Sequence, residues 1–362
     1  MAHLVFQTAF PGDLFLSIPL IRRIRDWDPD TPIVLACRPG LGDFFLKSGL
    51  VNEVIAVDKK SGSGRASAMS EIFSREWDVV FCPHQSTRTT LWMLRVRAKK
   101  AKIGFHKWWN GLVFTHRVKK PMEYPDALRQ MSLLTPLDGR LAIEFARPDF
   151  DRLRNTISQN SPFDYRTNPI PEWASMTLKG SAARTSEART SGKRIFIAPG
   201  SVWNTKRWKL SGFESLAQLL VKRGYSVELV GSAAEKILCD DIERRVEGVI
   251  NHAGKTTLSG LVDLFSEGTA LVCNDSGAMH AAAVAGLPTV AIFGPTVLSL
   301  GFRPWQDQAV VVQRPLPCRP CGKHGAEVCP IGTHECMESI APGEVLAALE
   351  DLIGVRSPEL KR

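Results

Sequence analysis

Residues 271–283 read Leu271-Val272-Cys273-Asn274-Asp275-Ser276-Gly277-Ala278-Met279-His280-Ala281-Ala282-Ala283. An apolar run ends in a polar turn and passes directly into an Ala-rich segment, which predicts a strand followed at once by a helix. Ser276 and Gly277 would then present backbone N–H groups at a helix N-terminus, where anions bind. His280 lies one turn further in and either faces the same anion or packs inside the domain.

The same alternation of short apolar runs and longer amphipathic segments extends over most of the 362 residues. It is typical of βαβ units around parallel sheets. Strands are expected at Leu4–Ala9, Ile33–Cys37, Val54–Val57, Val79–Cys82, Lys102–Phe105, Ile195–Ala198, Val227–Val230, Val249–Ile250, Ala270–Cys273 and Thr289–Phe293. Helices are expected at Leu14–Arg25, Phe213–Arg223, Ala233–Arg245, Leu258–Phe265 and Ser276–Ala285.

These elements predict an α/β protein with two Rossmann-like, doubly wound parallel-sheet domains. Ligands of such sheets bind outside the carboxyl ends of the strands, so we expect a cleft between the domains. The segment from Leu178 to Gly192 is small, polar and without apolar period, which favours a linker or surface loop. The predicted boundaries are 1–177, a linker at 178–192, a second domain at 193–341, and a C-terminal helix and tail at 342–362.

Charge is distributed unevenly along the chain. The composition, 44% hydrophobic and 23% charged, excludes disorder as the main state, and the formal net charge is +9. Between Val79 and Met122 there is no Asp or Glu, and ten cations stand there: Arg88, Arg95, Arg97, Lys99, Lys100, Lys102, Lys107, Arg117, Lys119 and Lys120. The stretch predicts an acidic partner. A nucleic-acid-binding surface using Trp92, Trp108 and Trp109 is a remote alternative, because no nucleic-acid module is recognised.

The sequence favours a soluble cytoplasmic protein, since neither a signal peptide nor a run of ~20 apolar residues is found. Four cysteines, Cys37, Cys82, Cys239 and Cys273, adjoin apolar runs and are expected in the core. Cys318, Cys321, Cys329 and Cys336 lie within nineteen residues. They are expected to be free thiols in a loop, with a structural zinc site or a disulfide as the alternatives.

The first predicted strand-to-helix turn contains Pro11, Gly12 and Asp13. The G-x-G-x-x-G spacing is absent, which disfavours a dinucleotide-binding enzyme. Asp13 instead places a carboxylate at the mouth of the sheet, where it is either a helix N-cap or a functional group. The second domain opens with a strand and a long polar loop that carries Lys206, Arg207 and Lys209. Three cations there suit a diphosphate, unless the loop is simply a solvated basic one.

Three motifs together resemble glycosyltransferase family 9, the lipopolysaccharide heptosyltransferases. They are Gly12-Asp13 with Leu16-Ser17-x-Pro19-Leu20, then Lys206-Arg207-Trp208, then Asn274-Asp275-Ser276-Gly277-x-Met279-His280, which extends through Gly286-x-Pro288 to Gly294-Pro295-Thr296. The resemblance covers nearly the whole chain. It implies a GT-B fold and an inverting enzyme that uses ADP-heptose as donor and requires neither metal nor cofactor.

The resemblance also implies roles for particular residues. Asp13 becomes the general base and Lys206 the cation that neutralises the leaving diphosphate. The donor pocket is expected to comprise Ser201, Thr205, Lys206, Glu235, Asp275, Ser276, Gly277 and His280, with Glu235 on the ribose hydroxyls. The acceptor, an anionic Kdo-bearing glycolipid at the inner face of the inner membrane, is expected to meet Gly12, Arg88, Arg95 and Arg97.

Pro11 and Lys209 depart from the family pattern, which usually has an aliphatic residue and a proline there, and the polar insert at 178–192 is unusual. The changes at Pro11 and Lys209 do not remove a proposed catalytic group. Family members also transfer other sugars, so a glycosyltransferase that uses a different nucleotide sugar is an alternative. A nucleotide-sugar epimerase or hydrolase is the competing enzyme class. We expect a monomer.

Overall fold

The computed structural model describes residues 1–84, 86–146, 163–164, 170, 174–178 and 194–354. Contacts divide these residues into two compact units. Unit 1 contains the described residues up to 146 together with 174 and 175, and unit 2 contains 163, 164, 170, 176–178 and 194–354. Most of the predicted linker at 178–192 and the end of the tail lie outside the described residues.

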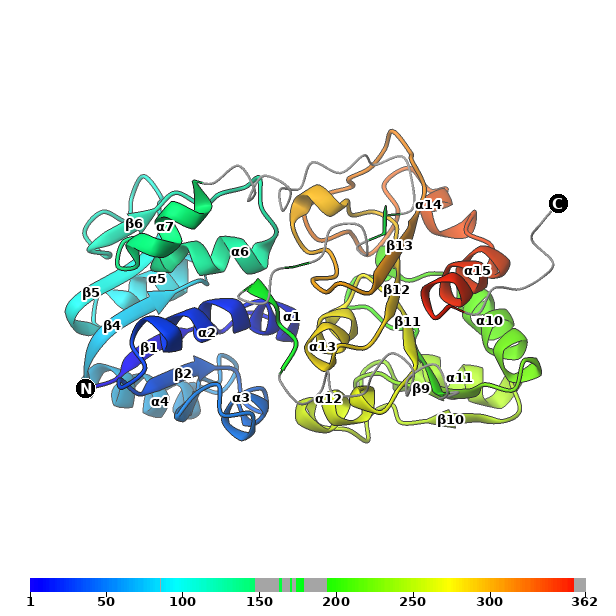
Figure 1. The fold of residues 1–362 in the computed structure, drawn as a ribbon, viewed down its shortest axis with the longest axis horizontal. Helices are drawn as coiled ribbons and strands as arrows, with labels where there is room; N and C mark the ends of the chain where they lie inside the picture. Colours follow the sequence, from blue (N-terminus) through cyan, green and yellow to red (C-terminus); the bar gives the residue numbers. More distant parts are fainter. Residues whose placement is uncertain (85, 147–162, 165–169, 171–173, 179–193, 355–362) are drawn as a thin grey trace. The chain divides into compact units, whose positions relative to one another are not determined.

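Unit 1 is a parallel sheet of six strands in the order β3-β2-β1-β4-β5-β6 (Figure 1). Its strands are β1 (His3–Phe6), β2 (Ile33–Cys37), β3 (Glu53–Ala56), β4 (Glu76–Cys82), β5 (Arg97–Phe105) and β6 (His116–Val118). The helices are α1 (Pro11–Phe15), α2 (Ile18–Trp27), α3 (Asp43–Lys47), α4 (Gly62–Ser74), α5 (Thr87–Met93), α6 (Asp126–Met131), η1 (Ser132–Leu134) and α7 (Gly139–Phe145).

Alternate residues of β1 face opposite sides of this sheet. Leu4 and Phe6 lie in one apolar core with Met69 and Ile72 of α4. Gln7 faces the other side. Its side chain hydrogen-bonds to Ser17, which follows α1, and to Gln130 of α6. Helices therefore cover both faces, as the doubly wound prediction requires.

Unit 2 is a seven-stranded sheet in the order β10-β9-β8-β11-β12-β13-β7, parallel except for β7 at its edge (Figure 1). The strands are β7 (Phe163–Asp164), β8 (Arg194–Ala198), β9 (Ser226–Leu229), β10 (Val249–Asn251), β11 (Ala270–Asn274), β12 (Thr289–Phe293) and β13 (Ala309–Gln313). The helices are η5 (Asn204–Lys206), α10 (Leu210–Lys222), α11 (Lys236–Arg245), α12 (Leu258–Ser266), α13 (Gly277–Ala285), η6 (Leu298–Leu300), α14 (Glu335–Glu338) and α15 (Pro342–Leu352).

Both faces of this second sheet are covered as well. Ile195 and Ile197 of β8 share a core with α10, α11 and α15, while Phe196 between them contacts Phe265 of α12, with ring centroids 5.2 Å apart. The C-terminal amphipathic segment, which the sequence left unplaced, thus packs on unit 2 through α15. The fold class predicted from the sequence is confirmed: two Rossmann-like, doubly wound sheets.

Several elements differ from the sequence prediction. The helix expected over Leu14–Arg25 is two helices, α1 and α2. Strand β5 begins at Arg97 rather than Lys102, so that part of the basic stretch is a strand. Strands β6, β7 and β13 were not predicted, because β6 and β7 are very short and Ala309–Gln313 lies beyond the last recognised motif.

Candidate active site

Lys206 is the centre of a buried polar group in unit 2. Its Nζ lies 2.6 Å from Asp275 Oδ2, and Thr296 Oγ1 donates a hydrogen bond of 2.7 Å to the same oxygen. The Lys206 and Asp275 side chains are only 10% and 6% exposed. Lys206, Asp275 and Thr296 follow the carboxyl ends of β8, β11 and β12, respectively. These three strands are neighbours in the sheet. The structure therefore brings the predicted cationic loop and the predicted anion turn together.

Asn274 explains how the loop after β8 is held beside β11. Its Nδ2 donates to Pro199 O at 2.9 Å, and its Oδ1 accepts from the backbone N–H of Trp208 at 2.9 Å. Ser201 adds a third tie, because its hydroxyl donates to Asp275 O at 3.3 Å. Trp208 is itself buried against Phe213, with centroids 4.9 Å apart. In the pair Asn274-Asp275, the amide positions the loop and the carboxylate positions its lysine.

The N-terminus of α13 lies directly after Asp275. Ser276 is the N-cap residue with extended backbone, and within the described chain its side chain makes no capping hydrogen bond. A Cβ added to Gly277 would meet no atom within 4 Å, so this helix start borders open space. The first N–H groups of an α-helix attract anions. His280 is only 4% exposed and packs inside the unit.

Glu235 lies beside the glycine of the loop after β8. Its Oε2 accepts hydrogen bonds from the backbone N–H and the hydroxyl of Ser232, at 2.8 and 2.7 Å. A Cβ on Gly200 would lie 2.3 Å from Glu235 Oε1, which is far inside van der Waals contact. The missing side chain at Gly200 therefore makes room for a carboxylate at the carboxyl ends of β8 and β9.

The C-terminal cysteine segment, residues 318–336, braces the Lys206 loop. The Thr205 hydroxyl donates to Ala326 O at 2.6 Å and accepts from Ala326 N–H at 2.8 Å. His334 Nε2 lies 2.8 Å from Thr205 O, and Asn204 Nδ2 donates to Glu327 Oε2 at 2.9 Å. The Thr205 hydroxyl is thus engaged with this segment. Nothing in the sequence spacing links residues more than a hundred positions apart in this way.

The eight cysteines are free thiols. Cys37, Cys82, Cys239 and Cys273 are buried as predicted, and burial raises the pKa of the Cys37, Cys82 and Cys239 thiols to about 12. In the cysteine segment, Cys321 Sγ donates to Cys318 O at 3.3 Å, and Cys329 Sγ accepts from His334 N–H at 3.3 Å. Within the described residues, one group brings three potential metal-ligand atoms within 4.8 Å: His3, Asp28 and Asp78, none of them cysteine.

In unit 1, Asp13 is the third residue of α1 rather than its N-cap. Its Oδ2 accepts a hydrogen bond of 3.2 Å from the backbone N–H of Phe10, which precedes the helix. Asp13 and the neighbouring Gly12 are half-buried. The helix follows the carboxyl end of β1, so the carboxylate lies at the edge of the sheet where ligands of this fold class bind.

Positive charges gather around His84 at the same edge of the sheet. Arg38 follows β2 and donates through Nε to Thr8 O at 3.0 Å, and His84 follows β4 and lies 3.0 Å from the Thr8 hydroxyl. Burial, together with the charges of Lys59, Arg38 and Lys107, lowers the pKa of His84 to about 4. Burial and the charges of Arg38 and Arg88 lower the pKa of Lys59 to about 8.

We name this group the edge cluster: Arg38, Lys59 and Lys107, whose charges act on His84, and Arg88, whose charge acts on Lys59. Its members follow the carboxyl ends of β2, β3, β4 and β5, and their charges lower the pKa values of His84 and Lys59. Like charges held close together in this way favour an anionic ligand. Of this group, the sequence analysis assigned Arg88 to the acceptor and counted Lys107 in the basic stretch, whereas Arg38 and Lys59 were not predicted.

Arg95 and Arg97 lie elsewhere. The Arg95 guanidinium lies over the Phe73 ring, 4.5 Å from its centroid, and Arg97 donates to Ser74 O at 3.0 Å. Arg97 is the first residue of β5, so both contact the end of α4 at the amino edge of the sheet. The structure does not bring them together with Asp13.

Comparison with known proteins agrees with this arrangement. Residues 65–330 match glycosyltransferase family 9 (heptosyltransferase). Lipooligosaccharide heptosyltransferase 2 of Haemophilus influenzae is 33% identical over 169 residues, which are 44% of this chain and 47% of that protein. The chain spans about half the length of the curated relatives that it matches.

Two solved structures share the fold over 98% of both chains. One is the glycosyl transferase family 9 protein of Veillonella parvula DSM 2008, with a TM-score of 0.75 and 19% identity. The other is the E. coli ADP-heptose lps heptosyltransferase II, with a TM-score of 0.72 and 22% identity. With the family match covering more than half of its length, the chain belongs to glycosyltransferase family 9, the heptosyltransferases, and has their GT-B fold.

Proposed function

We propose that this protein transfers heptose from ADP-heptose to the inner core of a lipopolysaccharide precursor, with inversion at the anomeric carbon. The observation that carries the proposal is the buried Lys206 ammonium beside the open N-terminus of α13, a place suited to a diphosphate. Unit 2 is the donor domain in this proposal, and unit 1 is the acceptor domain.

On the donor side, the diphosphate meets Lys206 and the N–H groups of Ser276 and Gly277. These donors stabilise the negative charge that develops as ADP leaves. Asp275 holds Lys206 in place and Glu235 accepts hydrogen bonds from the ribose hydroxyls, as an acidic residue after a Rossmann strand commonly does. Ser201, Thr205 and His280 shape the pocket through the loops and the helix that they position.

On the acceptor side, Asp13 takes the proton from the acceptor hydroxyl. The oxygen then attacks the anomeric carbon while the bond from that carbon to the diphosphate oxygen breaks, and ADP leaves with the electron pair. A carboxylate within reach of the attacking hydroxyl is the group that such general-base catalysis requires. No metal ion and no cofactor takes part in this scheme.

The edge cluster is proposed to bind the acidic groups of the acceptor. Four cations whose charges act on His84 or on Lys59 match a phosphorylated, Kdo-bearing glycolipid, which carries several negative charges. No described helix is long and apolar enough to cross a membrane. We propose that the protein acts as a monomer at the cytoplasmic face of the inner membrane, where that acceptor lies.

Mass spectrometry of the products tests this function. The protein is incubated with ADP-heptose and a Kdo-bearing lipid A acceptor, with and without a chelator. We expect one heptose to be added per acceptor and the chelator to have no effect. Rapid consumption of ADP-heptose without acceptor would instead favour an epimerase or hydrolase, and inertness toward ADP-heptose would favour a different donor.

Two charge reversals test the acceptor site and serve as a matched pair. Arg88→Glu changes the edge cluster, whereas Arg97→Glu changes a cation at the opposite edge of the same sheet. Arg88→Glu should raise the acceptor KM at least tenfold at low salt, less at high salt, and leave the donor KM unchanged. Equal effects of the two substitutions would contradict a specific site at the carboxyl edge.

A further inference from the structure

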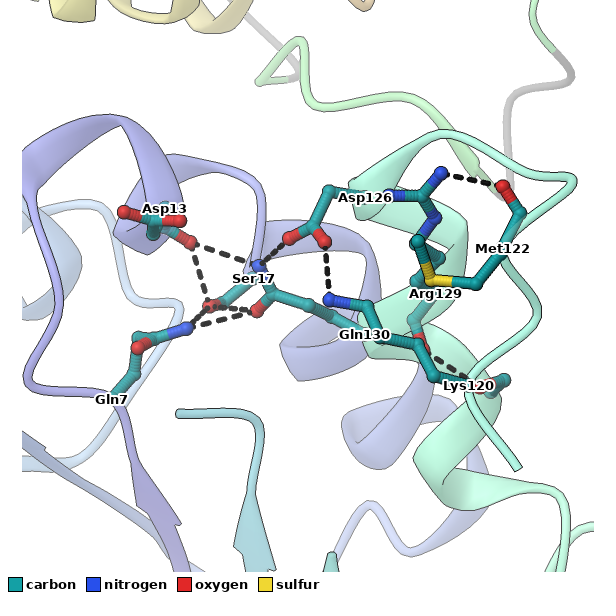
Figure 2. Close-up of polar contacts among 9 residues, drawn as sticks. Gln7, Asp13, Ser17, Lys120, Met122, Asp126, Arg129 and Gln130 are labelled. Carbon is teal, nitrogen blue, oxygen red and sulfur yellow. Dashed lines mark hydrogen bonds and ion pairs between the residues drawn. The ribbon is translucent and has the colours of Figure 1, made fainter. Parts of the chain in front are cut away.

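The helix that carries Asp13 ends in a break. In a continuous helix, Asp13 O would accept the backbone N–H of Ser17, but Ser17 N donates to Leu14 O instead, at 3.0 Å. Pro19 in the first turn of α2 contributes to the break, because it has no N–H for Phe15 O, four residues earlier, and its ring clashes with that carbonyl. Asp13 O accepts a hydrogen bond from the side chain of Gln130 and lies 3.2 Å from the Ser17 hydroxyl, whose one hydrogen is shared with Gln130 Oε1 (Figure 2).

Gln130 of α6 is one of these donors. Its Nε2 donates to Asp13 O at 3.1 Å and to Asp126 Oδ2 at 2.8 Å. Its Oε1 accepts from the Ser17 hydroxyl at 2.6 Å and from Gln7 Nε2 at 3.1 Å (Figure 2). These contacts use both hydrogens and both lone pairs of the amide, and the residue is only 2% exposed. The residue connects α6 to the backbone of Asp13 itself.

Asp126 fixes which way the Gln130 amide faces. An ionised carboxylate only accepts hydrogen bonds, so the NH2 group of Gln130 must point toward it. Although burial raises the pKa of Asp126, the charge of Lys120 and hydrogen bonds from Lys120 and Gln130 outweigh it and hold that pKa below its usual value. Lys120 Nζ lies 2.8 Å from Asp126 Oδ1. With the amide turned over, Gln130 Oε1 would oppose both the carboxylate and Asp13 O.

We propose that Gln130, oriented by Asp126 and Lys120, is a positioning residue for Asp13 in the transfer reaction; this rests on the function proposed above. Helix α1 has five residues, too few for its own hydrogen bonds to hold it firmly. The contact from Gln130 to Asp13 O fixes the backbone from which the proposed base projects. A shift of about 1 Å in a reacting group costs about a hundredfold in rate.

The test uses one substitution that removes the donor and a second that restores the fold. Gln130→Glu keeps the shape but replaces the NH2 group by an oxygen facing Asp126 and Asp13 O. In the double variant with Asp126→Asn, the new amide donates to the carboxylate introduced at position 130 and removes the repulsion between carboxylates, while Asp13 O still has no donor from that position.

We expect the double variant to recover the melting temperature lost by Gln130→Glu, while kcat stays at least tenfold below wild type and the donor KM stays within twofold. Hydrogen exchange at residues 13–17 should be faster in both variants. Recovery of kcat together with the melting temperature would show a purely structural role and overturn the proposal.

Failure of the proposed function is recognised separately. If wild-type protein transfers no heptose, the reaction assigned to the site is wrong, and hydrogen exchange still decides whether Gln130 holds α1. Unchanged exchange at residues 13–17 in Gln130→Glu would overturn the positioning role whatever the substrate.

Discussion

Replacing Gly200 by alanine tests whether the carboxylate of Glu235 binds the donor. The added Cβ would lie 2.3 Å from Glu235 Oε1 and 2.4 Å from its Cδ, so the carboxylate must move. The displaced group is the end of a flexible side chain, so the fold should lose no more than about 1 kcal/mol, which is typical of a single substitution. The Glu235 carboxylate would lose its hydrogen bonds from Ser232. It would also leave the position from which we propose that it binds the ribose.

The expected size of the effect follows from the contacts. A hydrogen bond to a charged group contributes about 1.5–3 kcal/mol, and about 1.4 kcal/mol corresponds to a tenfold change in Kd. Gly200→Ala should therefore weaken ADP binding about tenfold, measured by isothermal titration calorimetry. Glu235→Ala should weaken it by at least as much.

A double-mutant cycle decides the cause. In the Glu235→Ala background there is no carboxylate to displace, so adding Gly200→Ala should change the ADP Kd less than twofold. If the two substitutions instead weaken ADP binding independently, so that the double variant loses about a hundredfold, Gly200 acts through something other than Glu235. Unaltered ADP affinity in Glu235→Ala would refute the ribose role itself.

Three further predictions concern the other site residues. Asp13→Asn should abolish transfer with ADP-heptose binding unchanged, by calorimetry; an active variant would remove Asp13 from the role of base. The pKa of Lys59 is lowered to about 8, so this side chain should lose its charge as pH rises through 8, and the acceptor KM should increase above that pH. Lys59→Arg should abolish the increase. A pH-independent acceptor KM in the wild type would contradict a role of Lys59 in acceptor binding. Asp275→Asn leaves the buried Lys206 without its carboxylate and should lower the free energy of unfolding by about 3 kcal/mol, measured with urea; an unchanged midpoint would show that the pair does not stabilise the unit.

Strand positions were predictable where apolar runs are bounded by turn residues. Strand β12 spans Thr289–Phe293, as expected, because glycine residues flank a continuous β-branched and apolar run. The helix expected from Leu14 to Arg25 was wrong in one respect. Its apolar period continues across Ser17, but Pro19 breaks the hydrogen-bond ladder, and a periodicity argument does not register a missing N–H.

The proposed donor residues could be named from the sequence because they adjoin one another in short motifs. Lys206 and Asp275 belong to two such motifs, and parallel strands bring the ends of both to one edge. The edge cluster was mostly missed, since Arg38 and Lys59 stand alone in loops after separate strands. Arg95 and Arg97 are close to Arg88 in sequence, yet β5 starts at the opposite edge of the sheet, so proximity along the chain misled the prediction.

The pairing of Lys206 with Asp275 has a consequence for turnover. In the proposed reaction, the donor diphosphate competes with a carboxylate that already lies 2.6 Å from the Lys206 ammonium. The net gain from binding is then a difference between two strong contacts and is smaller than either. For the same reason we expect Asp275 to favour release of the nucleotide product after transfer.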